Sequence, residues 1–183
     1  MLYNFENQVL IGTVLGGSSL IKPPRGKNYY LSMRSKNDIW LQYKMAEMPT
    51  YFKKPVLHLY GGTYRCNSSC SEALTEIQES LYEGNKRTIK MEVLDSLRDI
   101  ALAIWFLDGG SKTGRGRKNA YINTTKFGEE GTNIVLKYFN EIGMPCNINR
   151  DASRFKILFT VDGTTTFLKI IAHRFPTFMY DRL

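Results

Sequence analysis

Two segments of the chain are almost entirely apolar, and each ends in glycine. The first, at residues 5–15, is followed by Gly-Gly-Ser-Ser at residues 16–19, and the second, at residues 101–107, is followed by Asp-Gly-Gly-Ser at residues 108–111. A continuous apolar run of this length is typical of a buried helix, and glycine commonly ends helices. We therefore predict two buried helices, each leading into a loop.

The remaining predicted elements alternate between helical and extended spacing. Helices are predicted at residues 38–48, 72–82, 133–142 and 165–172, and strands at residues 28–34, 56–60, 63–67, 147–150 and 155–160. Gly61 and Gly62 separate two of these strands and indicate a hairpin. The expected core positions are Ile39, Leu41, Tyr43 and Met45 in the first of these helices and Leu74, Ile77 and Leu81 in the second.

The order of elements repeats about half-way along the chain. Each apolar helix is followed by basic residues and then by an apolar and polar alternation, NYYLSMR at residues 28–34 and NAYINTT at residues 119–125. An internal duplication with the order helix, strands, helix, strands, helix explains this pattern better than one continuous domain. We predict an N-terminal subdomain at residues 1–84, a linker at residues 85–98 and a C-terminal subdomain at residues 99–183.

Charge narrows the class of partner. The 183 residues are 43% hydrophobic, enough for a core, and 25 Lys and Arg against 17 Asp and Glu give a net charge of +8. Such a surface attracts polyanions, either nucleic acid or an anionic membrane. No apolar run approaches the ~20 residues that span a bilayer, and no leader-like segment opens the chain. We expect no membrane partner, and an intracellular protein in the host cytoplasm, the nucleoid or an organelle matrix.

Cysteine and histidine do not predict a zinc site. The chain has three cysteines, Cys66, Cys70 and Cys146, and two histidines, His58 and His173. Their spacing provides no four-ligand set for zinc. We expect all three cysteines to be reduced and structural.

The two apolar helices carry a recognisable signature. LIGTVLGGS at residues 10–18 and LAIWFLDGG at residues 102–110 resemble the two namesake motifs of the LAGLIDADG homing endonucleases. The stretch KRTIKMEVLDSLRDIALAIWFLDGGSK is similar to the entry into the second motif of single-chain, intron-encoded members. The C-terminal FMYDRL resembles the Met-x-x-Lys-Leu ending of the same group, with Arg182 in the basic place. The resemblance extends over nearly the whole chain.

This resemblance implies an α+β fold. Two αββαββα subdomains are expected to form a pseudo-two-fold pair, with the signature helices packed together and the two antiparallel sheets forming a saddle over the DNA major groove. Close contact between helices requires small residues. Gly12, Gly16 and Ala103 provide such residues.

The acids that the family uses for cutting are missing. The resemblance places an aspartate at the eighth position of each motif, where the pair binds divalent metal, usually Mg²⁺, but here Gly17 and Gly109 occupy these positions. The resemblance also implies that the residue before each aspartate lends a backbone carbonyl to the metal, and Gly16 and Asp108 occupy these positions here. Hydrolysis of a phosphodiester needs the metal. We therefore expect weakened or lost Mg²⁺ binding, with Asp108 as a solvated or DNA-adjacent carboxylate; rescue of metal binding by Asp108 is the alternative.

The function implied by the resemblance is that of a homing endonuclease that binds a long, asymmetric double-stranded DNA site as a monomer, in a form that does not cut. Identical changes at both equivalent positions favour selected or deliberate inactivation over decay. Decay would also have altered the small residues between the two helices, the basic stretch that begins KRT and the FMYDRL ending, and all three are intact. One alternative is a non-catalytic DNA-binding protein or a maturase of intron RNA with the same ancestry. Another is an unrelated basic α+β RNA-binding protein.

Polar and basic residues on the strands and loops are the candidates for DNA contact, because Arg pairs with guanine and Asn with adenine in the major groove. In the first half they are Lys22, Arg25, Lys27, Tyr29, Ser32, Arg34, His58, Tyr60, Tyr64 and Arg65, followed by Lys86 in the linker. In the second half they are Lys112, Arg115, Arg117, Lys118, Asn119, Tyr121, Asn123, Asn147, Asn149, Arg154 and Lys156. Period-two spacing predicts that Lys27 and Tyr29 share a face, as do Asn119, Tyr121 and Asn123.

Two further features are candidates for contact with the DNA backbone. The glycine-rich basic loop GSKTGRGRKN, at residues 110–119, is expected to hold phosphates. Arg87 and Arg182 match the family's basic residues beside the active site, and the resemblance implies that they stabilise the scissile phosphate or hold water.

Overall fold

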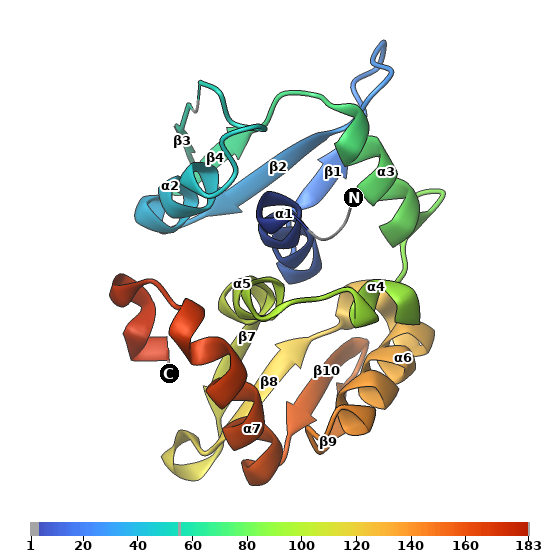
Figure 1. Cartoon of the computed structure of the whole chain (residues 1–183), viewed down its shortest axis with the longest axis vertical. Coiled ribbons are helices and arrows are strands. Elements are labelled where there is room, and N and C mark those ends of the chain that lie inside the picture. Colours follow the sequence, from blue (N-terminus) through green and yellow to red (C-terminus); the bar gives the residue numbers. More distant parts are fainter. Residues whose placement is uncertain (1–3, 55, 183) are drawn as a thin grey trace.

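The chain folds as two similar halves joined along a pair of central helices. The computed structural model describes residues 4–54 and 56–182. Each half follows the order α, β, β, α, β, β, α and contributes one four-stranded antiparallel sheet. Helices α1 and α5 lie next to each other between the two sheets (Figure 1). The predicted pair of αββαββα subdomains is confirmed.

The two halves share one strand order. The first half consists of α1 (Phe5–Gly16), β1 (Ser19–Ile21), β2 (Tyr30–Ser35), α2 (Asp38–Ala46), β3 (His58–Tyr60), β4 (Thr63–Asn67) and α3 (Glu72–Leu81). The second consists of α5 (Asp99–Gly109), β7 (Gly110–Thr113), β8 (Asn119–Asn123), α6 (Gly128–Glu141), β9 (Cys146–Asp151), β10 (Arg154–Phe159) and α7 (Val161–Ile171). The sheet orders β1-β2-β4-β3 and β7-β8-β10-β9 are equivalent. The internal duplication read from the sequence is therefore also present in the topology.

The connection between the halves is more structured than the predicted linker at residues 85–98. Strands β5 (Tyr82–Glu83) and β6 (Lys86–Arg87) form a two-stranded hairpin, and the short helix α4 (Met91–Asp95) packs against α6. Beyond α7, the 3-10 helices η3 (Ala172–Arg174) and η4 (Thr177–Arg182) bring the C-terminal segment back toward α2. The hairpin and the C-terminal segment carry Arg87 and Arg182 to the centre of the molecule.

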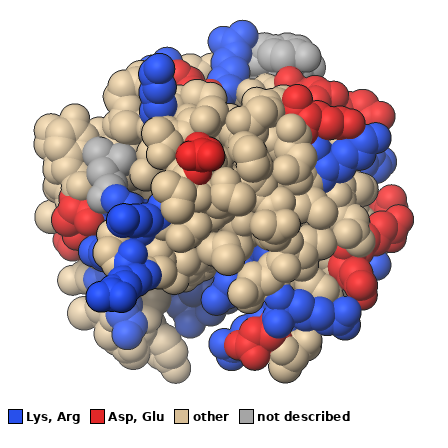
Figure 2. Space-filling view, turned by 90° about the horizontal axis from the view of Figure 1, so that it is seen from below, with Lys and Arg blue, Asp and Glu red and all other residues tan. Residues whose placement is uncertain are grey.

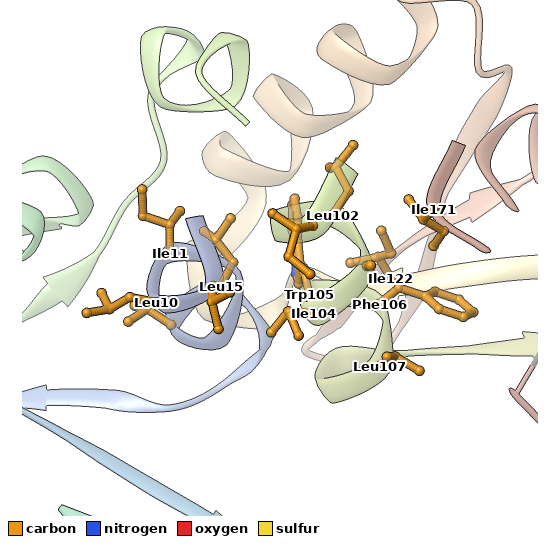
Figure 3. Packing of buried hydrophobic residues seen from close by; sticks show 14 of the residues in the cluster. Leu10, Ile11, Leu15, Leu102, Ile104, Trp105, Phe106, Leu107, Ile122 and Ile171 are labelled. Atoms are coloured by element: carbon orange, nitrogen blue, oxygen red, sulfur yellow. The ribbon is translucent and has the colours of Figure 1, made fainter. Parts of the chain in front are cut away.

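The seam between α1 and α5 depends on small residues. A Cβ atom on Gly12 would collide with the carbonyl oxygen of Ala101, and one on Gly16 would collide with the Cβ of Asp108. Figure 3 shows Leu15 of α1 facing α5, while Phe106 of α5 turns away toward Ile122 and Ile171. Both helices are buried along almost their whole length. Larger side chains at the seam would push the two halves apart.

Some local predictions are wrong in instructive ways. Ile39 is 54% exposed, while α2 buries Trp40, Leu41, Lys44 and Met45. The edge strands β1 and β7 were predicted as loops, because Ser-, Gly- and Lys-rich segments have little strand propensity and only pairing with β2 and β8 makes them strands. Helix α6 begins at Gly128 rather than at residue 133, since its polar first turn carries no apolar spacing.

The three cysteines are free in the structure. Cys66 and Cys146 are buried in the core, whereas Cys70 is exposed. Burial raises the pKa of the Cys66 thiol and of the Cys146 thiol to about 11. Both thiols are therefore protonated at neutral pH and fill the core as small apolar side chains.

Candidate functional site

Strand register decides which side chains share a face of the first sheet. Leu31, Met33 and Cys66 are buried against the helices, so the residues that alternate with them face away from the core. Ser32 pairs with Asn67, and Arg34 pairs with Arg65. We call the uncovered surface the open face of the first sheet; it carries Ser19, Tyr30, Ser32, Arg34, His58, Tyr60, Thr63, Arg65 and Asn67.

The second sheet has an equivalent open face. Ala120, Ile122 and Ile157 are buried, and Tyr121 and Asn123 alternate with them. The open face of the second sheet carries Ser111, Thr113, Asn119, Tyr121, Asn123, Asn147, Asn149, Arg154, Lys156 and Leu158. The Lys156 ammonium lies 4.7 Å from the centroid of the Tyr121 ring, which holds the lysine along the sheet. Both sheets therefore present polar and basic side chains on the surface that their helices leave uncovered.

Three of the predicted contact residues do not share these faces. Tyr29 and Tyr64 are partly buried and pack against the hydrophobic core, and Lys112 pairs with the buried Ala120, on the side that the helices cover. The expectation that Tyr29 extends a face with Lys27 fails because β2 begins only at Tyr30. The remaining predicted basic residues lie exposed in loops, in the 3-10 helix η1 (Arg115–Arg117) or in β6: Lys22, Arg25, Lys27, Lys86, Arg115, Arg117 and Lys118.

The open faces meet at the C-terminal ends of α1 and α5, which we call the helix tips. A hollow of about 330 Å³ extends from Gly16, Gly17 and Asp108 to Ser32, Arg34 and Arg65 of the first sheet. A second hollow of about 560 Å³ extends from the same three tip residues to Tyr121, Asn123, Arg154 and Lys156 of the second sheet. Seen from below the view of Figure 1, Lys and Arg side chains predominate where the lower margin of the surface is hollowed (Figure 2).

The α1 tip is surrounded by cations. Gly17 adopts φ +136°, a conformation that L side chains rarely take, and its backbone N–H donates to Val14. Arg87 is 8% exposed and donates to the carbonyl oxygens of Val14, at 2.6 Å, and Ser18, at 2.7 Å. The Lys126 ammonium, from the second half, donates to the carbonyl oxygen of Gly17 at 2.5 Å. These bonds satisfy carbonyl groups at the end of the helix.

Lys126 is held in a strongly positive environment. Burial of its ammonium, followed by the nearby charges of Arg87 and Arg34, lowers the pKa of Lys126. The side chain as a whole remains solvent-exposed. Lys126 lies on η2 (Thr125–Phe127), directly after β8, and lines the larger hollow.

The α5 tip is organised around an acid. The Asp108 carboxylate accepts hydrogen bonds from the Lys44 ammonium at 2.8 and 3.0 Å and from the Trp40 indole at 2.6 Å. The Lys44 and Asp108 side chains are 2% and 12% exposed, so the ion pair is largely buried. Arg182 donates to the carbonyl oxygen of Gly110 at 2.8 Å. Asp108 is therefore largely buried rather than solvated, and that part of the sequence interpretation is corrected. Its carboxylate is already engaged by Lys44 and Trp40, which argues against rescue of a metal site. Because Asp108 also lines both hollows, its place beside a bound DNA stays a prediction.

Residues 7–167 match the sequence profile of the LAGLIDADG DNA endonuclease family. The chain belongs to this family. It is 25% identical over 161 residues to "Probable intron-encoded endonuclease 1" of Wickerhamomyces canadensis, a match that covers 81% of this chain and 68% of that protein. It is also 31% identical over 201 residues to "Protein RecA" of Mycobacterium shimoidei, which covers 100% of this chain. The chain spans 47% of that RecA, about half its length.

Solved structures of LAGLIDADG proteins share this fold. The homing endonuclease I-WcaI bound to its DNA recognition sequence matches with a TM-score of 0.86 and 22% identity, over 98% of this chain and 85% of that one. I-DmoI in complex with DNA and Mn matches with a TM-score of 0.61 and 14% identity, over 91% of this chain and 95% of that one. The LAGLIDADG scaffold is thus present over nearly the whole length of the chain.

The residues at the tips do not fit the divalent metal that LAGLIDADG nucleases are expected to use. Gly17 and Gly109 have no side-chain ligand, and Asp108 is engaged by Lys44 and Trp40. Within residues 4–54 and 56–182, no three His, Cys, Asp or Glu side chains are grouped so that they could hold a metal ion. The tips present ammonium and guanidinium groups instead, which repel a cation.

Sequence reasoning missed Lys126, Lys44 and Trp40. Lys126 follows β8 in a segment with no motif, so its contact with Gly17 depends wholly on the packing of one half against the other. Trp40 and Lys44 did leave a signal, since their i, i+4 spacing puts both on one side of α2, beside Leu41 and Met45. A lysine on the apolar side of a helix either extends its ammonium to solvent or pairs with a buried group, and Lys44, at 2% exposure, pairs with Asp108.

Among the described residues, no helix is both long enough and apolar enough to cross a bilayer.

Proposed function

We propose that this chain is a site-specific DNA-binding protein on the homing-endonuclease plan, which binds a long, asymmetric duplex as a monomer and does not cut it. The observation that carries the proposal is the convergence of two polar, basic open faces on one pair of helix tips. Two related but unequal halves suit two unequal half-sites, since they carry different side chains on equivalent strands.

The chemistry of the open faces suits direct reading of bases. Arg34 and Arg65 on the first sheet can pair with guanine, and Asn123, Asn147 and Asn149 on the second can pair with adenine. The exposed segments outside the sheets add Lys22, Arg25, Lys27, Arg115, Arg117 and Lys118, which suit phosphates rather than bases. The net charge of +8 favours the same partner. I-WcaI and I-DmoI, which share the fold, are bound to DNA in their structures.

The chemistry of the helix tips supports the proposed absence of cutting. Hydrolysis of a phosphodiester on this plan needs a metal to activate water and offset charge on the leaving oxygen. Gly17 and Gly109 cannot ligate a metal through side chains, and Asp108 already has a buried partner. The proposal therefore assigns binding, without Mg²⁺-dependent hydrolysis, to this chain.

Selection from a random duplex library tests the binding half of the proposal. The protein should enrich one long site without two-fold symmetry and bind it equally well in EDTA. Competition with unrelated duplex and with structured RNA at one fixed salt concentration measures specificity. Tighter binding to the RNA would favour the maturase alternative, and the lack of any enriched duplex would refute the proposal.

Incubation of a plasmid carrying the selected site tests the other half. Wild-type protein should leave the plasmid supercoiled with Mg²⁺ or Mn²⁺ under conditions where the site is saturated. The Gly17→Asp/Gly109→Asp variant reports whether the enzyme ancestry is recoverable. Nicking or linearisation by the wild-type protein would contradict the proposal, and a restored variant that binds but never nicks would favour a lineage dedicated to binding.

A further inference from the structure

The C-terminal ends of α1 and α5 create an electrostatic problem for a protein that binds DNA without metal. Each helix C-terminus carries about half a negative charge from its unpaired carbonyl groups. Both ends border the hollows that the open faces share. A phosphate entering these hollows would be repelled unless fixed positive charge lay in front of the carbonyl groups.

Three cations cover these carbonyl groups. Arg87 donates to Val14 and Ser18, and Arg182 donates to Gly110. Lys126 differs from both arginines, because it reaches across from the opposite half to the position that lacks its aspartate. Its ammonium donates to the Gly17 carbonyl oxygen and lies 3.5 Å from where a Cβ on Gly17 would be. The Lys126 ammonium therefore lies beside the space that a side chain at position 17 would enter.

Lys126 also has the freedom to bind a second group. An ammonium has three N–H donors, and the bond to Gly17 uses one of them. The side chain is exposed and lines the hollow of about 560 Å³ together with Arg154 and Lys156. The only acid lining that hollow, among the described residues, is Asp108, whose charge is offset by Lys44. The hollow is thus positive and open.

We propose that the larger hollow at the helix tips is a metal-independent phosphate site, in which the Lys126 ammonium binds a backbone phosphate at the centre of the DNA target. The proposal rests on the DNA-binding function proposed above. Lys126 holds the phosphate with one or two N–H donors while a third stays on Gly17. Arg154 and Lys156 flank the same phosphate from the second sheet. The chain thus replaces a bound metal ion with a fixed ammonium, which can hold DNA but cannot generate a nucleophile from water.

Neutral phosphates locate this contact. A set of duplexes carrying the selected site is prepared, each with one central phosphate replaced by an uncharged methylphosphonate, and affinities are measured in EDTA. For wild-type protein, one central replacement should weaken binding about tenfold, the size expected for a charge-assisted hydrogen bond. Lys126→Met should weaken binding to unmodified DNA by a similar factor. The same replacement should then cost Lys126→Met little more, because the two changes remove one interaction.

Two controls make the test specific. Lys118→Met removes a cation from the exposed loop after β7, and it should weaken binding while keeping full sensitivity to the central methylphosphonate. Lys126→Gln, which keeps a donor but no charge, guards against an effect of side-chain shape. Both Lys126 variants should make the plot of log affinity against log salt shallower by about one unit.

The outcomes separate this inference from the proposed function. If wild-type protein binds a selected site but Lys126→Met remains as sensitive to every central methylphosphonate as wild type, the phosphate site is refuted while DNA binding stands. A central contact that appears only when Mg²⁺ is added at constant ionic strength would refute it too. If no duplex is bound specifically, the proposed function fails first, and the phosphate site fails with it.

Discussion

The tips of α1 and α5 occupy equivalent places in the two halves but are built from opposite charges. The described residues of the α1 tip contribute no carboxylate of their own, and Arg87 and Lys126 bond directly to its backbone carbonyl oxygens. At the α5 tip a carboxylate, Asp108, remains and is neutralised by Lys44. Both tips carry a glycine at the motif position where the family resemblance implies an aspartate, yet only one of them has its cation exposed to a shared hollow.

Each half supplies a lysine to the helix tip of the other half. Lys126 comes from the second half and bonds to the α1 tip, whereas Lys44 comes from the first half and bonds to the α5 tip. Lys126 is exposed and can contribute to DNA binding, whereas Lys44 is buried and can contribute to stability. Substitutions at the two tips should therefore separate these properties.

Loss of the buried lysine is expected to have the largest effect. Lys44→Ala leaves the largely buried Asp108 without its cation, and removal of one partner of a buried pair costs about 3–5 kcal/mol. Urea unfolding measures the loss. Lys126→Ala, the matched change at the other tip, should cost less than about 1 kcal/mol, because that side chain is exposed.

A double variant checks the cause. Lys44→Met combined with Asp108→Leu removes both charges, and it should recover most of the stability lost in Lys44→Ala, since an apolar pair can replace a buried ion pair. Equal losses for Lys44→Ala and Lys126→Ala would erase the contrast between the tips.

The two arginines should rank next. Arg87→Met removes donors from Val14, Ser18 and the Tyr82 hydroxyl in a buried setting and should cost about 3 kcal/mol. Arg182→Met removes one bond, to Gly110, and should cost about 1 kcal/mol. Thermal unfolding of both variants, measured at one pH and salt concentration, tests the ranking. A larger loss for Arg182→Met would mean that the C-terminal segment, rather than the hairpin, holds the tips.

Gly17 and Gly109, the equivalent glycines of the two motifs, should respond differently to an added side chain. Gly17→Ala forces φ +136° on an alanine, which should cost about 2 kcal/mol. A Cβ on Gly109 would lie 3.2 Å from the Gly16 carbonyl oxygen, so Gly109→Ala needs only a small shift and should cost less than about 1 kcal/mol. Unfolding curves for the two single variants give the comparison. If Gly17→Ala proves neutral, the backbone at the α1 tip is not fixed by its glycine.

The sequence predicted more of the fold than of the tips. Apolar runs and half-chain repetition are local or periodic signals, and they predicted two similar halves in the order helix, strands, helix, strands, helix. The resemblance of the two motifs implied the paired αββαββα architecture that the structure has. The tip chemistry depends on contacts between residues far apart in the chain, such as Gly17 with Lys126 and Asp108 with Lys44. No spacing rule encodes those pairs. Tyr29 and Tyr64 were misplaced for a related reason, since strand register sets their face and the sequence does not give strand ends to one residue.

The smallest predicted effect concerns the opposite ends of the two helices, which differ as their tips do. The uncharged Asn4 caps α1 through a bond from the Asn7 N–H at 2.7 Å, whereas Asp99 begins α5 with bonds from His173 at 2.8 Å and Arg174 at 2.9 Å. Burial acts to raise the pKa of Asp99, but the hydrogen bonds from Arg174, the Ile100 N–H and His173 outweigh it, so the pKa lies below the ordinary value of 3.8.

A lowered folded-state pKa fixes the sign of the pH dependence. The unfolded chain takes up the Asp99 proton first, so the stabilisation by Asp99 is present above pH 3.8 and is lost as pH falls from there through the folded-state pKa. Partly exposed ion pairs contribute at most about 1 kcal/mol. Unfolding free energies measured from pH 6 down to about pH 3 should therefore fall less steeply for Asp99→Asn than for wild type. Asn4→Ala should lower the free energy of unfolding by a constant amount over this pH range, because the Asn4 cap does not titrate. A loss that changes with pH in Asn4→Ala would contradict the assignment of this acid sensitivity to Asp99.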